Sequence, residues 1–130
     1  MSRREQSIRT PLGRVRGLGS ARHGVGHFIT QRVSAIALVM LVPWFLITLI
    51  GAVRGGYEGA LAYLSDPLNA VVVILAVSAA LYHMRLGMQV VIEDYIAKPG
   101  LRISLLVLNT FVCIALFATA AYAVLKIAIS

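Results

Sequence analysis

Three long apolar runs dominate the chain, at about residues 33–53, 68–94 and 103–129, separated by shorter polar stretches. A helix that crosses the hydrocarbon core of a membrane needs about 20 mostly apolar residues, and each run reaches that length. A chain in lipid must satisfy its own backbone hydrogen bonds, so each run is expected to be a helix, and three strands are too few to close a barrel. The pattern predicts an all-α membrane protein with three transmembrane helices.

The polar stretches divide the chain into two expected parts. Residues 1–32 are polar and rich in Arg and Gly, and we expect a cytoplasmic N-terminal segment that has no core of its own. Residues 33–130 are expected to form the three-helix transmembrane domain. Between the first two runs, residues 57–64 suggest a short interfacial helix. The second long helix is expected to start at Asp66–Pro67, because proline suits a first helical turn.

Basic residues are concentrated before the first apolar run. The formal net charge is +7, and seven of the twelve Lys and Arg residues precede residue 33, against the single acid Glu5. Cytoplasmic segments of membrane proteins carry the excess of Lys and Arg, so we expect the N-terminus in the cytoplasm and the C-terminus in the periplasm. The N-terminal arginines are expected to lie against anionic lipid headgroups or along a soluble partner. The charge therefore requires no nucleic acid.

Composition narrows the class of function. With 59% hydrophobic residues and a mean hydropathy of +0.86, the chain is too apolar for an ordinary soluble domain. The sequence has no phosphate loop, nucleophile triad or pair of catalytic carboxylates. The single cysteine, Cys113, lies within the third run and is expected to have a packing role. The candidate chemistry lies in the second run.

His83 is expected to lie inside the membrane. It follows Pro67 by 16 residues, which is about 24 Å along a helix. An ionisable side chain at this depth is costly unless it is paired, ligated or hydrated, and so it marks a candidate functional site. Gly87 follows one turn later on the same face, where the lack of a side chain suits either a flat macrocycle or a close helix crossing. His83 is thus either a hydrogen-bonded packing residue or a haem ligand, and the second axial ligand has to come from another subunit.

A further polar group precedes the first run. His27, Gln31 and Arg32 are expected to lie close to one face of a helix. His23 and His27 have the spacing of a metal-binding pair, but no carboxylate or further Cys/His cluster stands nearby, and hydrogen bonding to a headgroup is the alternative. Arg32 is expected either to extend to the interface or to pair with a buried anion.

Two blocks of sequence resemble the small hydrophobic membrane-anchor subunit of bacterial succinate dehydrogenase, the respiratory complex II. The blocks are His83-x3-Gly87-Met88 running on to Asp94-Tyr95, and PLGRVRGLGSARHGVGHF-x2-QRVSA at Pro11–Ala35. The likeness covers nearly the whole chain, and the family has three transmembrane helices. It implies a location in the bacterial inner membrane and a part in the tricarboxylic acid cycle and electron transport.

The resemblance also implies roles for single residues. His83 is expected to supply one axial ligand to the iron of haem b, with Gly87 beside it, and the partner cytochrome subunit supplies the other ligand. Tyr95 is expected to donate a hydrogen bond to a carbonyl of ubiquinone, and Asp94 to orient that site or relay protons. Arg32 is expected near the haem propionates and the quinone pocket.

The implied partners are a large cytochrome b anchor subunit, an iron–sulfur subunit and a flavoprotein subunit. Succinate oxidation in the family belongs to the last two, so this chain is expected to dock them and to contribute to ubiquinone reduction without being catalytic alone. Two alternatives remain: a haem-less anchor in which His83 packs or binds quinone, and a structural or assembly membrane protein without a redox role. No inverted repeat supports a transporter.

Overall fold

The computed structural model describes residues 10–16 and 24–130. A short helix, α1 (Pro11–Arg16), begins after Thr10, whose hydroxyl accepts a hydrogen bond from the backbone N–H of Gly13 at 3.1 Å. This is the usual way in which a threonine satisfies an amide that has no partner within its helix. The other helices are α2 (Gly24–Arg54), α3 (Gly56–Ser65), α4 (Pro67–Tyr95) and α5 (Pro99–Ile129).

The three predicted transmembrane helices are confirmed. α2, α4 and α5 are each long and apolar enough to cross a membrane. α2 begins at Gly24, nine residues before the first apolar run, so the helix continues across the predicted boundary between the N-terminal segment and the transmembrane domain at residue 33. Two glycines in its first turn disfavour a helix by about 1 kcal/mol each relative to alanine, but tertiary contacts routinely override such propensities. The contacts of α2 with α4 that are described below lie further along the helix, at Gln31 and Ser34.

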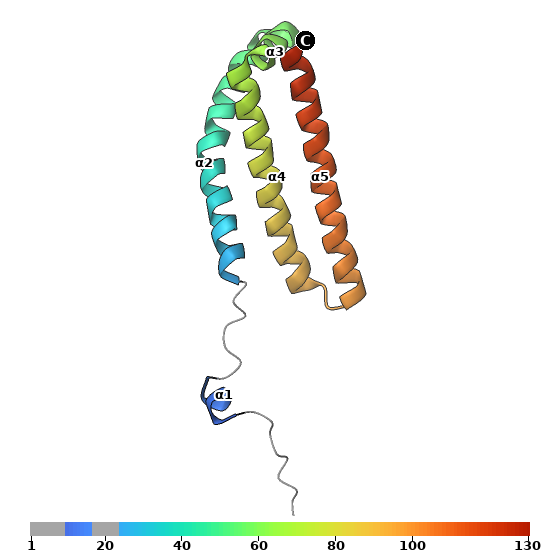
Figure 1. Ribbon diagram of the computed structural model, residues 1–130. Coiled ribbons are helices and arrows are strands. Elements are labelled where there is room, and N and C mark those ends of the chain that lie inside the picture. Colours follow the sequence, from blue (N-terminus) through green and yellow to red (C-terminus); the bar gives the residue numbers. More distant parts are fainter. Residues whose placement is uncertain (1–9, 17–23) are drawn as a thin grey trace, which may run out of the picture.

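α4 is the middle helix of the three. It contacts both α2 and α5, whereas α2 and α5 do not contact each other anywhere in residues 24–130. Figure 1 shows the three long helices side by side and alternating in direction, with α3 and the C-terminus together at one end. We call this end the α3 end. The opposite end, where α2 begins, α4 ends and α5 begins, is called the Tyr95 end.

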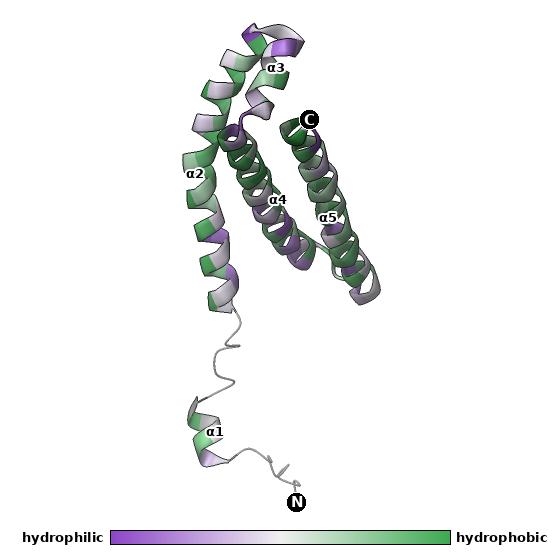
Figure 2. Cartoon of the chain, turned by 45° about the horizontal axis from the view of Figure 1, so that its top comes forward, coloured by the Kyte–Doolittle hydropathy of each residue, from purple (hydrophilic) through white to green (hydrophobic). Residues whose placement is uncertain are grey.

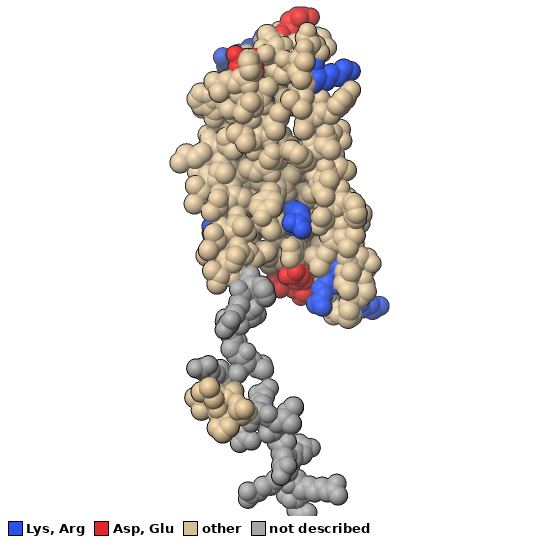
Figure 3. Space-filling view, in the orientation of Figure 1, with Lys and Arg blue, Asp and Glu red and all other residues tan. Residues whose placement is uncertain are grey.

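Few side chains are buried within the chain itself. The largest buried apolar cluster lies at the α3 end and is formed by Ala70, Val73 and Val124. Most other apolar side chains are exposed, and Figure 2 shows hydrophobic residues along the full length of the three long helices. Figure 3 shows charged side chains at the two ends and a mostly uncharged middle, with an isolated basic patch. Such a surface is one that lipid and partner helices cover.

Glycines form the corner between α2 and α3. Gly56 has φ of +65°, which lies in the left-handed region that glycine adopts without steric cost. Gly59 packs directly on the end of α2, because a Cβ built there would lie 2.5 Å from the carbonyl oxygen of Ala52. The corner therefore depends on the absence of side chains, and it lets α3 fold back against α2.

The predicted short helix at residues 57–64 is confirmed as part of α3. The hydroxyl of Tyr63 lies 2.8 Å from Oγ1 of Thr48, so a hydrogen bond joins α3 to α2. The predicted start of α4 is also confirmed. Pro67 occupies the first turn, and the side chain of Asp66 caps the helix by accepting a hydrogen bond from a backbone N–H at 3.0 Å.

Candidate functional site

His83 is bonded to α2 through its imidazole ring. Its Nδ1 atom lies 3.0 Å from Oγ of Ser34. Ser34 is only 7% exposed and is the one buried polar residue among those whose burial the structure describes. The pair joins α2 to α4 at the depth at which the sequence places His83 in the membrane.

The second bond of Ser34 favours one tautomer of His83. Oγ of Ser34 also lies 2.9 Å from the backbone oxygen of Gln31, and a carbonyl oxygen can only accept, so the single hydroxyl proton is donated there. Nδ1–H of His83 then donates to Ser34, which leaves a lone pair on Nε2. This is the form in which a neutral histidine, held by a hydrogen bond to its other nitrogen, ligates a metal.

Gly87 lies one turn from His83, beside α2. A Cβ built on Gly87 would meet only Nε2 of Gln31, at 4.0 Å, which is an ordinary contact. The packing of α2 on α4 therefore leaves room for a methyl group and does not itself require glycine here. We call Gln31, Ser34, His83 and Gly87 the His83 cluster.

The face of α2 that carries this cluster differs from the predicted one. His27, Gln31 and Ser34 follow at spacings of four and three, so they share a face. Arg32 lies to the side of it, because one residue turns a helix by about 100°. It is exposed, and its Cζ lies 5.0 Å from the centre of the Phe28 ring. The expected grouping of Arg32 with His27 and Gln31 is therefore wrong.

His27 has a polar atom without a partner. Its Nε2 is buried and forms no hydrogen bond within the part of the chain that the structure describes. The proposed metal pair of His27 with His23 is not tested, because His23 lies outside the described residues. Within residues 10–16 and 24–130, no group of three or more His, Cys, Asp or Glu is placed to hold a metal ion. The other ligands of a metal on His83 would therefore come from outside the described part of the chain.

Asp94 and Tyr95 are the last two residues of α4 and are exposed at the Tyr95 end. The side chain of Tyr95 is 80% exposed. The neighbouring Glu93 accepts a hydrogen bond from Nε2 of Gln89 at 2.8 Å. The described residues supply no such partner to Asp94 or Tyr95, so both side chains remain available to a ligand or another subunit.

Arg32 and Tyr95 lie at different positions along the axes of the helices. Ser34 of α2 faces His83 of α4. Arg32 lies two residues from Ser34 along α2, and Tyr95 lies twelve residues from His83 along α4. Both offsets are toward the Tyr95 end. At 1.5 Å per residue, these offsets are about 3 Å and about 18 Å. Arg32 therefore lies at nearly the level of His83. About 15 Å along the helix axis separates it from Tyr95.

Arg85 is a charged residue to which the sequence analysis assigned no role. It lies on the side of α4 that faces α5, where its Nε donates to Oγ1 of Thr110 at 3.2 Å. Nδ2 of Asn109 donates to the backbone oxygen of Arg85 at 3.0 Å. Cys113, which is also on α5, is buried, in agreement with its predicted packing role. The signal that singles out Arg85 is the one used for His83: an ionisable residue within an apolar run.

Known proteins match most of the chain. The profile of a family described as "Succinate dehydrogenase/Fumarate reductase transmembrane subunit" matches residues 6–121. A Rickettsia bellii relative is 36% identical over 100 residues, covering 77% of this chain and 80% of the relative. A Paracoccus denitrificans relative is 33% identical over 117 residues, covering 90% of each chain. Both are described as succinate dehydrogenase hydrophobic membrane anchor subunits, and the residues matched by the family profile include the whole candidate site.

Proposed function

Because the chain belongs to the family of transmembrane subunits of succinate dehydrogenase and fumarate reductase, we propose that it anchors a bacterial succinate:ubiquinone oxidoreductase in the inner membrane. In this proposal it docks the flavoprotein and iron–sulfur subunits, shares haem b with a larger cytochrome b subunit and contributes to the site of ubiquinone reduction. Succinate is oxidised on the soluble subunits. The N-terminus lies in the cytoplasm and the C-terminus in the periplasm.

The hydrogen bond between Ser34 and His83 is the observation that carries the proposal. Together with the contact of Ser34 with the Gln31 carbonyl, it favours the Nδ1–H tautomer of the imidazole, in which Nε2 is able to ligate iron. Gly87, one turn along α4, presents no side chain beside that ligand. Arg32 lies at nearly the same level and carries a fixed positive charge that suits a propionate carboxylate. Haem b, when bound, supplies a one-electron centre.

Tyr95 and Asp94 are proposed to act on ubiquinone at the Tyr95 end. Negative charge grows on a quinone carbonyl as electrons arrive, and a donor aimed at that oxygen stabilises the reduced forms more than the oxidised form. The phenol of Tyr95 is neutral and donates a hydrogen bond without introducing a charge, and its exposure leaves it free to do so. Asp94 is exposed next to it and able to relay protons. The axial offset favours a role for Arg32 near the haem over a bond to the same carbonyl as Tyr95.

The test of haem ligation is the variant His83→Leu in the assembled complex. Its reduced visible spectrum is expected to lose or sharply change the b-type absorbance, while succinate oxidation with an artificial soluble acceptor persists. His27→Leu is the matched control, because it removes a histidine of the adjacent helix and leaves Ser34 and His83 in place. A normal b-type spectrum in His83→Leu contradicts ligation and returns His83 to a packing role, whereas a wild-type complex without b-type absorbance supports the haem-less anchor. A purified complex without flavoprotein, haem or quinone supports the structural or assembly role.

A further inference from the structure

Arg85 carries a positive charge inside a transmembrane helix, away from the acidic residues of the described chain. These acids lie in the α3 region or at the end of α4: Glu58, Asp66, Glu93 and Asp94. A guanidinium at membrane depth is costly unless it meets an anion or water. The described chain therefore leaves the charge of Arg85 to be met from outside.

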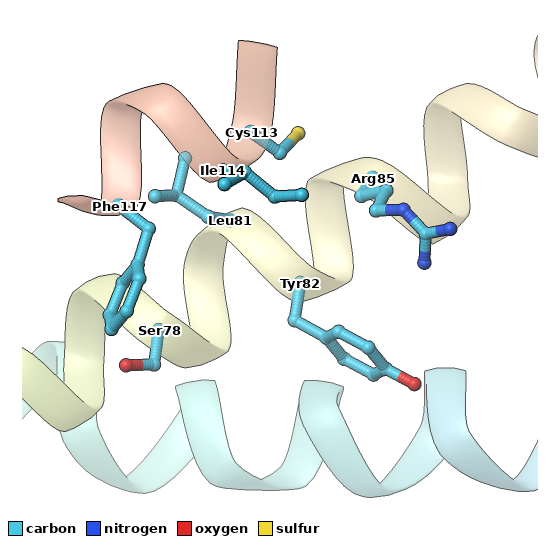
Figure 4. Close-up of a pocket in the computed structure, with 7 residues that line it drawn as sticks. All are labelled: Ser78, Leu81, Tyr82, Arg85, Cys113, Ile114 and Phe117. Carbon is cyan, nitrogen blue, oxygen red and sulfur yellow. The ribbon is translucent and has the colours of Figure 1, made fainter. Parts of the chain in front are cut away.

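The guanidinium of Arg85 is held in a defined direction. Oγ1 of Thr110 donates its own proton to the backbone oxygen of Leu106 at 3.0 Å, so it accepts from Nε of Arg85. Figure 4 shows the rest of the guanidinium extending along α4 toward the C-terminal end of that helix. An arginine has five N–H groups, and this bond uses one of them. The remaining donors point toward the Tyr95 end, where lipid headgroups lie if the helices span a bilayer.

A shallow cavity of about 180 Å³ opens beside Arg85 between α4 and α5. Its walls on α4 are Ser78, Leu81 and Tyr82, and those on α5 are Cys113, Ile114 and Phe117. Figure 4 shows most of these side chains on the side of Arg85 opposite to the direction of its guanidinium, while the ring of Tyr82 extends in the same direction as the guanidinium. The seam thus combines a cation near one end with a mostly apolar hollow that extends toward the middle of the membrane.

We propose that this seam binds an anionic phospholipid. The phosphate accepts from the guanidinium nitrogens that Thr110 does not use, since the planar fork of arginine suits phosphate oxygens. An acyl chain lies in the hollow against Ile114 and Phe117. Arg85 is two residues from His83 and therefore about 200° around α4, so the lipid site and the His83 cluster lie on different sides of the helix.

The geometry favours lipid over a carboxylate of another subunit. Ile114 is 58% exposed and Phe117 is 38% exposed, so the hollow opens on the outer surface of this chain. The guanidinium extends along the helix toward headgroup level, whereas a neighbouring transmembrane helix would approach it from the side. An amphiphile with an acidic head and an apolar tail matches both the charge and the walls of the seam.

The experiment counts phospholipids retained by the assembled complex, using native mass spectrometry after detergent washing with either phosphatidylglycerol or phosphatidylcholine present. Arg85→Gln removes the charge, and Ile114→Trp fills the hollow and keeps the charge. Arg54→Gln is the control at the α3 end. Wild type and Arg54→Gln are expected to prefer phosphatidylglycerol. Arg85→Gln is expected to weaken that preference by at least about five-fold, the effect of one arginine at a membrane surface. Ile114→Trp is expected to lose the bound lipid.

Equal retention of phosphatidylglycerol by wild type, Arg85→Gln and Ile114→Trp overturns the proposal. An altered haem spectrum in Arg85→Gln with unchanged lipid also overturns it, and assigns the charge to the haem. Loss of another subunit from Arg85→Gln with unchanged lipid in the complexes that do assemble overturns it in favour of a protein carboxylate. If Arg85→Gln does not assemble, Ile114→Trp decides, because it leaves Arg85 and its bond to Thr110 in place.

Discussion

At the scale of the residue, the chemistry of this chain depends on contacts between helices. The sequence singles out His83 because a histidine stands within an apolar run. Its partner Ser34 could not be predicted in the same way, because serine is ordinary in a membrane helix and one sequence does not show how two helices are aligned. The sequence feature that points to Ser34 is its position on one helical face with His27 and Gln31. His27 and Gln31 were considered in the sequence analysis, but Ser34 was not.

Ser34→Ala tests the hydrogen bond to His83. The change leaves Nδ1–H of a half-buried imidazole without its acceptor, and the loss of such a partner typically weakens metal affinity about 10–100-fold. We expect lower haem occupancy or a shifted midpoint potential in the purified complex, measured by the reduced spectrum during a redox titration. Ser34→Thr keeps the hydroxyl and is expected to restore both values. A wild-type titration curve in Ser34→Ala would show that this bond does not act on the haem.

Tyr95→Phe tests the quinone donor. The variant keeps the aromatic ring and removes only the hydroxyl, so assembly and haem content are expected to be unchanged. Loss of one catalytic hydrogen bond costs about 1–3 kcal/mol, and succinate–ubiquinone activity is expected to fall accordingly. Tyr122→Phe, an exposed tyrosine of α5, is the matched control. Full ubiquinone turnover in Tyr95→Phe would leave Tyr95 as an ordinary interfacial aromatic residue.

At the scale of the element, hydropathy and proline position predict the helices well, and helix ends less well. The three apolar runs are helices, and Pro67 begins α4 as predicted. Hydropathy alone does not locate the start of α2, because the nine residues from Gly24 that precede the apolar run are more polar and contain glycine. The contacts of α2 with α4 described above lie further along the helix, at Gln31 and Ser34, and involve residues about fifty positions further along the chain. Local propensity contains no information about such contacts.

Gly59→Ala tests the corner between α2 and α3. The new methyl group would lie 2.5 Å from the carbonyl oxygen of Ala52, a backbone atom that cannot move aside without displacing the helix. Overpacking of this kind costs about 1–3 kcal/mol. We expect a lower thermal unfolding temperature of the solubilised complex. Gly51→Ala is the control, because a Cβ there meets nothing within 4 Å. Equal melting temperatures for the two variants would contradict the close packing at Gly59.

At the scale of the whole molecule, the orientation in the membrane rests on charge alone. The excess of Lys and Arg before α2 predicts a cytoplasmic N-terminus, which, with three crossings, puts the C-terminus in the periplasm. A reporter enzyme that is active only in the periplasm is therefore expected to be active when fused at residue 130 and inactive when fused after Ala97. The reverse pattern would invert the orientation and move Tyr95 to the periplasmic side.

The central position of α4 also determines how substitutions in this chain should combine. α2 and α5 have no contact with each other in residues 24–130, and at the Tyr95 end only α4 connects them. Sites that share no partner usually have additive effects, whereas sites in contact show coupling energies of about 0.5–3 kcal/mol. Changes at Ser34 and Thr110 should therefore be nearly additive in a double-mutant cycle, while each couples to its own partner on α4. At the Tyr95 end of the described chain, the middle helix is therefore the thermodynamic link between the haem-facing and lipid-facing sides that we propose.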